Sequence, residues 1–236
     1  DVPAIEKVIT DKTKAIILNS PNNPSGAVYT KKSLVALNTV LEDAQKKTGN
    51  TIYVVSDEPY VKIAYDGVEV PAISAIFKNS IVVNSFSKSL ALPGERIGYV
   101  AVNPAIEGAD VLMDAMIFFF CSLGFVNAPG LFQKFVADHL YDVAGLEAYK
   151  ERRDALYEIL IETGYECEKP QGAFYLFPKA PIADDVAFCN RAINHRLVLV
   201  SGTGFGYPGY FRLAYCVSMD TIKNSKESFA ALRKEF

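Results

Sequence analysis

The chain is poor in the residues on which several kinds of active site depend. Its 236 residues include two histidines, His139 and His195, and four cysteines that lie far apart without a CxxC pair. A histidine-based catalytic triad is therefore not expected, and no metal site is predicted. Scattered cysteines of this kind are typical of reduced thiols in a cytosolic protein.

Strong charge and long hydrophobic runs are also missing. The formal net charge of −3 gives no electrostatic reason to expect a nucleic acid or an anionic membrane as a partner. The longest apolar stretch, residues 115–126, is too short to cross a bilayer and contains Gly124, so a buried or interface helix is expected there. No signal peptide is visible, and we expect a cytoplasmic location.

The first half of the chain alternates between strand and helix patterns. Leucines at helical spacing predict a helix over residues 31–47. Four short apolar segments predict strands at residues 14–18, 52–55, 80–84 and 97–102. Near-continuous apolar strands separated by helices are typical of an α/β fold with a mostly parallel sheet and helices on both faces.

The second half changes character. Long helical patterns run through residues 113–120 and over 129–160, with an interruption near Gly145. The later segments predict strands at 173–177 and 211–215, a helix at 184–194, and a final helix that begins with Asp220 as N-cap. We therefore expect two domains, a large α/β domain over residues 1–150 and a small α+β domain over 151–236.

Polar residues follow three of the predicted strands. The first strand leads into NSPNNPSG (residues 19–26), the second into SDEPY (56–60), and the third into SFSKS (85–89) with Arg96 shortly after. In an open parallel sheet, ligands bind beyond the carboxyl ends of the strands. Together these segments supply an amide, a carboxylate, a phenol, an amine, hydroxyls and a guanidinium. That set suits a flat anionic cofactor with a ring nitrogen, a phosphate and an aldehyde.

The residue types match the chemistry of such a cofactor. A lysine in an enclosed site forms a Schiff base with an aldehyde, and desolvation lowers its pKa so that it can act as a base. A carboxylate beside a pyridine nitrogen keeps that nitrogen protonated, which makes the ring an electron sink. Serine hydroxyls and an arginine can hold a phosphate, the arginine through two parallel hydrogen bonds.

These segments resemble motifs of the class I/II aminotransferases, enzymes that depend on pyridoxal 5'-phosphate (PLP) and have fold type I. NSPNNPSG resembles their NPxNPTG turn, SDEPY their D-x-x-Y strand end, and SFSKS with the later RIG their PLP-lysine signature. PQGAFY (170–175) is similar to their PxGxFY segment, and GTGFG (202–206) with FRL (211–213) to their G-x-x-F-G…R-L ending. The five motifs follow the family order and extend over nearly the whole chain.

The resemblance implies three catalytic residues. Lys88 would form the Schiff base with PLP, and Asp57 would pair with the pyridinium nitrogen. Tyr60, together with Asn23, would hydrogen-bond the phenolic oxygen of the ring. The implied activity is transfer of an amino group between an α-amino acid and a 2-oxo acid by a homodimeric enzyme related to aspartate aminotransferases.

The resemblance also implies binding residues. Ser85, Ser87 and Arg96 would hold the phosphate of PLP. Arg212, with Asn23 nearby, would bind the α-carboxylate of the substrate. The chain opens at Asp1, close to the end of a helix pattern, so we expect it to lack an N-terminal portion and to be inactive alone.

Each motif taken alone has a structural explanation. NNPSG is a common turn sequence, SFSKS suits a surface loop, and Arg212 in an apolar strand could belong to a structural ion pair. Five coincidences in one order are much less probable than one. We interpret residues 118–120, a run of three phenylalanines, as core or dimer interface, and neither histidine is assigned a role.

Two other classes of function remain open. PLP-dependent lyases and cyclising enzymes share the fold and the lysine, as do the aminotransferase-like effector sensors of some transcription regulators. An attached winged-helix domain would identify a regulator. Turnover of an amino acid together with a 2-oxo acid would separate a transaminase from a lyase.

Overall fold

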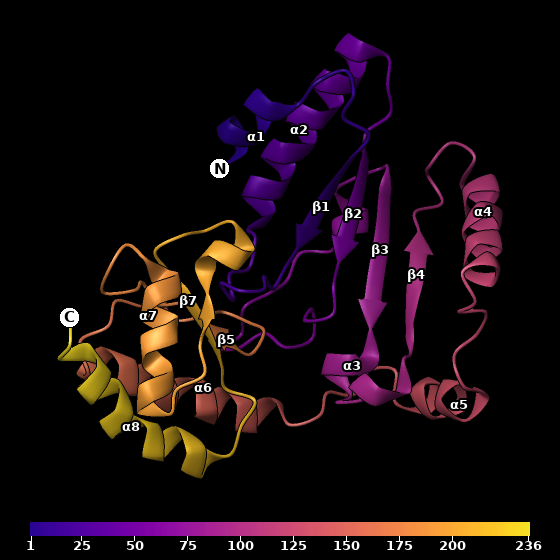
Figure 1. Cartoon of the computed structure of the whole chain (residues 1–236). Helices are drawn as coiled ribbons and strands as arrows, with labels where there is room; N and C mark the ends of the chain where they lie inside the picture. Colours follow the sequence, from indigo (N-terminus) through magenta and orange to yellow (C-terminus); the bar gives the residue numbers. More distant parts are fainter. The chain divides into compact units, whose positions relative to one another are not determined.

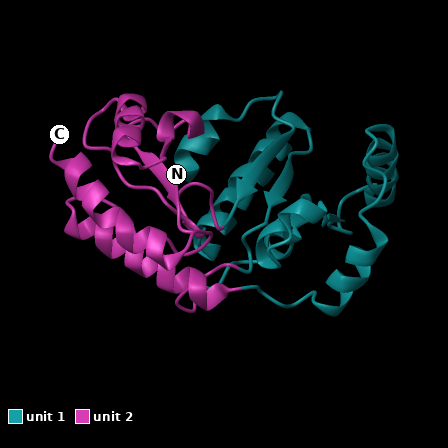
Figure 2. Cartoon of the chain, turned by 60° about the horizontal axis from the view of Figure 1, so that its bottom comes forward, with its two compact units in different colours: residues 1–20, 29–62, 69–144 teal, residues 21–28, 63–68, 145–236 magenta.

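The computed structural model describes residues 1–236 and divides into two compact units (Figure 2). The first unit comprises residues 1–20, 29–62 and 69–144, and the second comprises 21–28, 63–68 and 145–236. The units change at residue 145, and two short segments of the N-terminal half belong to the second unit. The expected domain boundary at residue 150 stays a prediction, because compact units need not coincide with domains.

The first unit is built on a four-stranded sheet (Figure 1). Its elements are α1 (Val2–Val8), β1 (Ala15–Asn19), α2 (Lys31–Thr48), β2 (Tyr53–Asp57), η1 (Ile73–Ala75), β3 (Ser80–Ser85), α3 (Phe86–Ser89), η2 (Pro93–Glu95), β4 (Gly98–Val102), α4 (Ala109–Ser122) and α5 (Gly130–Asp138). The strand order is β1-β2-β3-β4. The first three strands are parallel and β4 is antiparallel to β3, which confirms the predicted mostly parallel sheet.

Helix α2 covers one face of this sheet. Leu34, Leu37 and Leu41 lie on one side of the helix and pack with Leu18 and Val54 of the sheet in one hydrophobic core. Burial of each leucine stabilises the fold by about 2 kcal/mol. The three leucines at helical spacing are therefore the reason that this segment forms a helix against the sheet.

Capping residues set the two ends of α2. The Thr30 hydroxyl accepts a hydrogen bond from the Ser33 amide at the N-terminus, and Gly49 ends the helix in a left-handed conformation.

The face of the sheet opposite α2 is more open, and Ile17 on β1 is 73% exposed there. At β1, therefore, a helix of this chain covers only the face of the sheet on which α2 lies.

Helix α4 contributes nothing to the core of the first unit. None of its residues is buried, and Phe118, Phe119 and Phe120 are exposed. The interpretation of these phenylalanines as core residues is therefore wrong for this chain, because no other element of the chain covers them. Their alternative role at an interface stays a prediction.

The second unit combines a small antiparallel sheet with helices. Its elements are α6 (Leu146–Glu162), β5 (Tyr175–Leu176), α7 (Asp185–Ala192), η3 (Ile193–His195), β6 (Val200–Ser201), η4 (Gly202–Phe205), β7 (Phe211–Ala214) and α8 (Met219–Arg233). The strand order is β5-β7-β6. The two-residue strand β6 was not predicted, because so short a segment has no periodicity.

The interruption predicted near Gly145 is confirmed, whereas the start of the last helix differs from the expectation. Residues 129–160 form two helices, α5 and α6, and Gly145 is the N-cap of α6 at φ +69°. The N-cap of α8 is Ser218 rather than Asp220, because the Ser218 hydroxyl accepts a hydrogen bond from the Thr221 amide. Asp220 lies in the first turn, where its negative charge stabilises the helix dipole.

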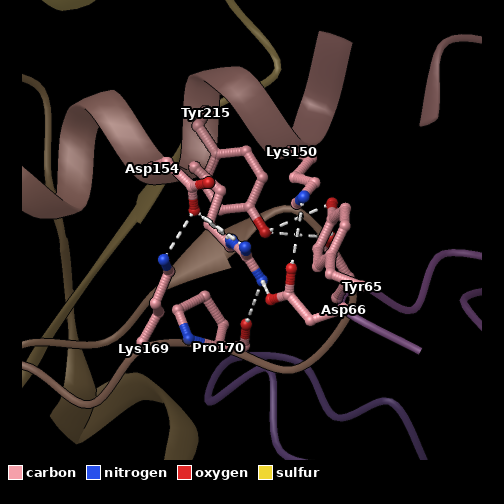
Figure 3. Close-up of polar contacts among 9 residues, drawn as sticks. Tyr65, Asp66, Lys150, Asp154, Lys169, Pro170 and Tyr215 are labelled. Atoms are coloured by element: carbon pink, nitrogen blue, oxygen red, sulfur yellow. Dashed lines mark hydrogen bonds and ion pairs between the residues drawn. The ribbon is translucent and has the colours of Figure 1, made fainter. Parts of the chain in front are cut away.

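A buried arginine joins three segments of the second unit (Figure 3). The Arg153 side chain on α6 is 1% exposed, and its guanidinium lies 2.8 Å from carboxylate oxygens of both Asp66 and Asp154. It also donates to the Pro170 carbonyl at 3.1 Å and lies over the Tyr65 ring. Segment 63–68, helix α6 and the segment before β5 are thus held by one cation.

Two tyrosine hydroxyls complete this network. Tyr65 and Tyr215 both donate to the Ala173 carbonyl, at 2.6 and 3.0 Å. Burial raises the pKa of Tyr65 to about 12, so the phenol stays protonated and remains a donor.

No helix of the chain has the length and apolar character needed to span a membrane.

Candidate functional site

The register of the parallel strands aligns their carboxyl ends. Asn19 at the end of β1 is paired with Asp57 at the end of β2, and Asp57 is paired with Val83 of β3. Ser85, the last residue of β3, lies two positions further along. The polar segments that the sequence placed after these strands therefore begin at the same edge of the sheet.

Asp57 is a partly buried carboxylate with a neutral hydrogen-bond partner. The Asn19 side-chain amide donates to an Asp57 carboxylate oxygen at 3.2 Å and to the Asp57 carbonyl at 2.9 Å. Burial raises the pKa of Asp57 above its usual value. A positively charged N–H donor at this carboxylate would oppose that shift, because it favours the ionised form.

Tyr60 and Glu58 lie shortly after Asp57 in the chain. Tyr60, an expected site residue, is buried in the turn that follows β2. No role was predicted for Glu58, yet burial raises the pKa of its carboxyl. A hydrogen bond from Ser56 lowers this pKa in part, and the nearby charge of Asp57 raises it further. Two acidic groups with raised pKa values thus follow one strand, which is typical of functional sites.

Lys88 lies in a one-turn helix that starts directly after β3. Ser85 is the N-cap of this helix, where its hydroxyl accepts from the Ser87 amide at 3.1 Å and donates to the Ser87 hydroxyl at 2.7 Å. Lys88 itself is half-buried. The structure thus brings three of the expected residues, two serines and the lysine, together at the end of one strand.

Arg96 is close in the chain path but its guanidinium points elsewhere. The Phe86 amide donates to the Ile97 carbonyl at 3.1 Å, which holds the two segments together. The exposed Arg96 side chain donates to the Pro93 carbonyl at 2.8 Å. No hydrogen bond joins it to the hydroxyls of Ser85 or Ser87, so its expected role at a phosphate stays a prediction.

A tightly packed turn carries Asn23 in the second unit. Gly26 adopts φ +68°, and its carbonyl accepts from the amides of Gln171 and Gly172 at 2.9 Å each. A Cβ atom on Gly26 would lie 2.3 Å from the Cβ atom of Pro170. Only glycine fits at this contact, so the turn and the segment before β5 hold each other in place.

Arg212 and Asn23, the two expected substrate ligands, are in contact. Arg212 lies on β7, and its Nη1 donates to Asn23 Oδ1 at 2.9 Å. The guanidinium carbon lies 4.5 Å from the ring centre of Tyr175 and 4.8 Å from that of Phe205. An amide oxygen and two ring faces carry no formal negative charge, so this arginine is not the structural ion pair considered from the sequence.

The aromatic contacts of Arg212 were not expected from the sequence. Tyr175 and Phe205 stood inside recognised motifs, but nothing in the local pattern indicated that both rings face one guanidinium. A cation between two rings gains about 0.5–2 kcal/mol per favourable contact. The rings also restrict the rotamers of the side chain, so the planar fork is held in one orientation and can donate two parallel hydrogen bonds to a carboxylate.

Comparisons with known proteins agree with the motifs. The family model "Aminotransferase class I and II" matches residues 1–229. The aspartate aminotransferase of Bacillus subtilis is 34% identical over 94% of the chain and 58% of its own length. The aromatic-amino-acid aminotransferase 2 of Thermococcus litoralis is 30% identical over 99% of the chain and 61% of its own length.

A solved structure of similar fold supports the same assignment. An amino transferase from Eubacterium rectale superposes with a TM-score of 0.97 at 43% identity, over 100% of this chain and 59% of that one. The chain therefore spans about three fifths of the length of the proteins that it matches.

Proposed function

The chain belongs to the class I and II aminotransferase family, and we propose that the protein carrying it is a PLP-dependent enzyme that transfers an amino group between an α-amino acid and a 2-oxo acid. The observation that carries this proposal is the shared sheet edge of the first unit, where Asp57 and the Ser85–Lys88 segment follow neighbouring parallel strands. The arrangement of Arg212 and Asn23 in the second unit supports the choice of substrate class.

The residues of the sheet edge fit the proposed cofactor. Asp57 has a pKa raised by burial and a neutral amide as partner, so a protonated ring nitrogen would supply the cation that this carboxylate lacks. The hydroxyls of Ser85 and Ser87 lie at the start of α3 and suit a phosphate. Lys88 is the amine that would bind the aldehyde. When bound, PLP supplies an electron-withdrawing ring that stabilises negative charge at the substrate α-carbon.

The chain's own side chains would perform the remaining tasks. Asp57 would hold a proton on the ring nitrogen. Lys88 would accept the proton from the substrate α-carbon as a general base. Arg212 would bind the substrate carboxylate, and Asn23 would hold the Arg212 guanidinium through its amide oxygen. Tyr60 would donate a hydrogen bond from its phenol to the phenolic oxygen of the cofactor ring.

The experiment that tests the proposal replaces Lys88. In the whole protein, Lys88→Ala should lower transamination at least about 1000-fold, because one residue supplies both the covalent link and the base. Lys78→Ala, at an exposed lysine of the same unit, is the matched control and should keep wild-type turnover. A Lys88→Ala enzyme within tenfold of the wild type would refute the assignment.

The same assay separates the alternative activities. A transaminase consumes a 2-oxo acid and releases a new amino acid in equal amounts. A lyase or cyclising enzyme would consume the amino acid without using the 2-oxo acid. Production of the second amino acid is therefore the quantity to measure.

A homodimer is part of the proposal. The exposed apolar side chains on α4 support it, because a patch that includes three phenylalanines is costly in water. Analytical ultracentrifugation of the whole protein should give twice the monomer mass.

A further inference from the structure

Asp185 is a buried carboxylate whose partners all lie in one loop. It is 2% exposed and is the first residue of α7. One carboxylate oxygen accepts from the Thr203 amide at 2.8 Å, and the other accepts from the Thr203 hydroxyl at 2.8 Å and from the Gly209 amide at 3.0 Å. The hydrogen bonds therefore join the start of α7 to both ends of the loop formed by residues 203–209.

The charge of Asp185 is stabilised without a cation. Burial by itself raises the pKa of this carboxyl, but the hydrogen bonds from Thr203 and Gly209 outweigh burial and the net shift is downward. The position at a helix N-terminus acts in the same direction. The group is thus ionised at neutral pH and accepts all three hydrogen bonds at once.

The loop that Asp185 holds carries one face of the Arg212 site. Phe205 lies between the two anchored residues, and its ring centre is 4.8 Å from the Arg212 guanidinium carbon. Phe205 is 37% exposed, so packing restrains it only in part. The anchoring of Thr203 and Gly209 therefore acts together with an edge contact from the Phe177 ring, whose centre is 6.3 Å away, to direct the Phe205 ring toward the arginine.

We propose that Asp185 is a positioning residue for Arg212, which acts by fixing the 203–209 loop so that the Phe205 ring holds the guanidinium in its carboxylate-binding orientation. The inference rests on the proposed function, since that function gives Arg212 its ligand. Asp185 touches neither Arg212 nor the carboxylate. Its effect passes through the loop that carries Phe205.

The physical reason is the freedom of an arginine side chain. An arginine that must be ordered on binding loses about 0.5–1.5 kcal/mol of affinity, whereas one held beforehand between Tyr175 and Phe205 does not. Loosening one of the two rings returns part of this freedom. The loss should therefore appear in binding of the carboxylate and not in the chemical step.

The test compares two neighbouring carboxylates of α7 in the whole protein. Asp185→Asn keeps the shape but turns an NH2 group toward an N–H donor of the loop, which breaks at least one hydrogen bond. Asp184→Asn is the matched control, because Asp184 caps the Ala187 amide and asparagine caps equally well. The readouts are kcat, KM for the amino acid, and the Kd of the dicarboxylate probe maleate by calorimetry.

We expect Asp185→Asn to raise KM and the maleate Kd about fourfold while kcat changes less than about twofold. Asp184→Asn should leave all three unchanged. Phe205→Leu should raise KM and Kd by a similar factor, and the double variant Asp185→Asn/Phe205→Leu should be no worse than Phe205→Leu. This non-additivity is the signature of a residue that acts through another.

Several outcomes would overturn the inference. They are an unchanged Kd in Asp185→Asn, a fall in kcat alone, or multiplication of the two effects in the double variant. If Asp185→Asn does not fold, Thr203→Val takes its place. It removes one of the three donors and must raise Kd about threefold. Absence of transamination in the wild type would instead refute the proposed function, while the maleate Kd values would still decide the role of Asp185.

Discussion

Substitution of Gly26 by alanine tests whether the turn that carries Asn23 depends on a close backbone contact. Gly26 has φ +68°, and an added Cβ would lie 2.3 Å from the Pro170 Cβ and 2.9 Å from the Gly172 carbonyl oxygen. The neighbour is a ring carbon next to the backbone, so it cannot rotate away. The turn would have to move, and its hydrogen bonds to Gln171 and Gly172 would lengthen.

The expected magnitude has two parts. A non-glycine residue in the left-handed region costs about 1–2 kcal/mol. Overpacking by one carbon against a rigid neighbour costs about 1–3 kcal/mol more. Alanine recovers about 0.4–1 kcal/mol because it restricts the unfolded chain. We therefore expect Gly26→Ala to lower the free energy of unfolding by about 3 kcal/mol.

Gly145→Ala is the matched control in the same unit. Gly145 has φ +69° but no atom lies within 4 Å of the position of its Cβ. It should lose only the conformational part, about 1 kcal/mol. Urea unfolding followed by circular dichroism measures both variants, since the chain has no tryptophan for fluorescence. If the two variants differ by less than about 0.5 kcal/mol, the contact with Pro170 does not constrain the turn.

Four further predictions follow from the site and its supports. Asp57→Asn should lower transamination at least about 100-fold, measured as kcat, because a neutral amide cannot keep the ring nitrogen protonated; a kcat near the wild-type value would contradict this role. Arg212→Lys should raise KM for amino and 2-oxo acids at least about tenfold and leave PLP affinity, measured by absorbance titration, unchanged. Arg153→Met should lower the free energy of unfolding by about 2 kcal/mol, because it removes the buried hydrogen bonds to Asp154 and the Pro170 carbonyl, although Lys169 still pairs with Asp154; a stabilised variant would show that the cation is dispensable. The hydrogen bonds lower the pKa of Asp185, so its contribution to stability is present above the unfolded-state pKa and is lost as pH falls through the folded-state pKa. The free energy of unfolding, measured at several pH values below about pH 4, should therefore decrease less with falling pH in Asp185→Asn than in the wild type.

Much of the first unit follows from local patterns in the sequence. Strand and helix periodicities located β1, β2, β3 and α2 to within a few residues. Parallel strands connected by helices run in one direction, so their carboxyl ends must lie at one edge. For this reason the sequence alone predicted that Asp57 and Lys88 would follow neighbouring strands.

Contacts between distant residues had no such local signal. The pattern around Arg153 gave no indication of Asp66, which lies 87 positions earlier and reaches the guanidinium only because segment 63–68 joins the second unit. Nor did the motif around residue 205 reveal that a carboxylate on α7 holds its loop.

The division between the two levels has a physical cause. Hydrophobic periodicity and turn residues act over a few positions, so the sequence by itself determined the longer elements, their order and the residue types at the strand ends. The direction of a side chain such as Arg212 depends on which rings and amides surround it after packing, and Asn23 lies 189 positions away. The tertiary structure alone decided that these groups meet, that Asp185 anchors both ends of one loop, and that the Arg96 guanidinium bonds to the Pro93 carbonyl.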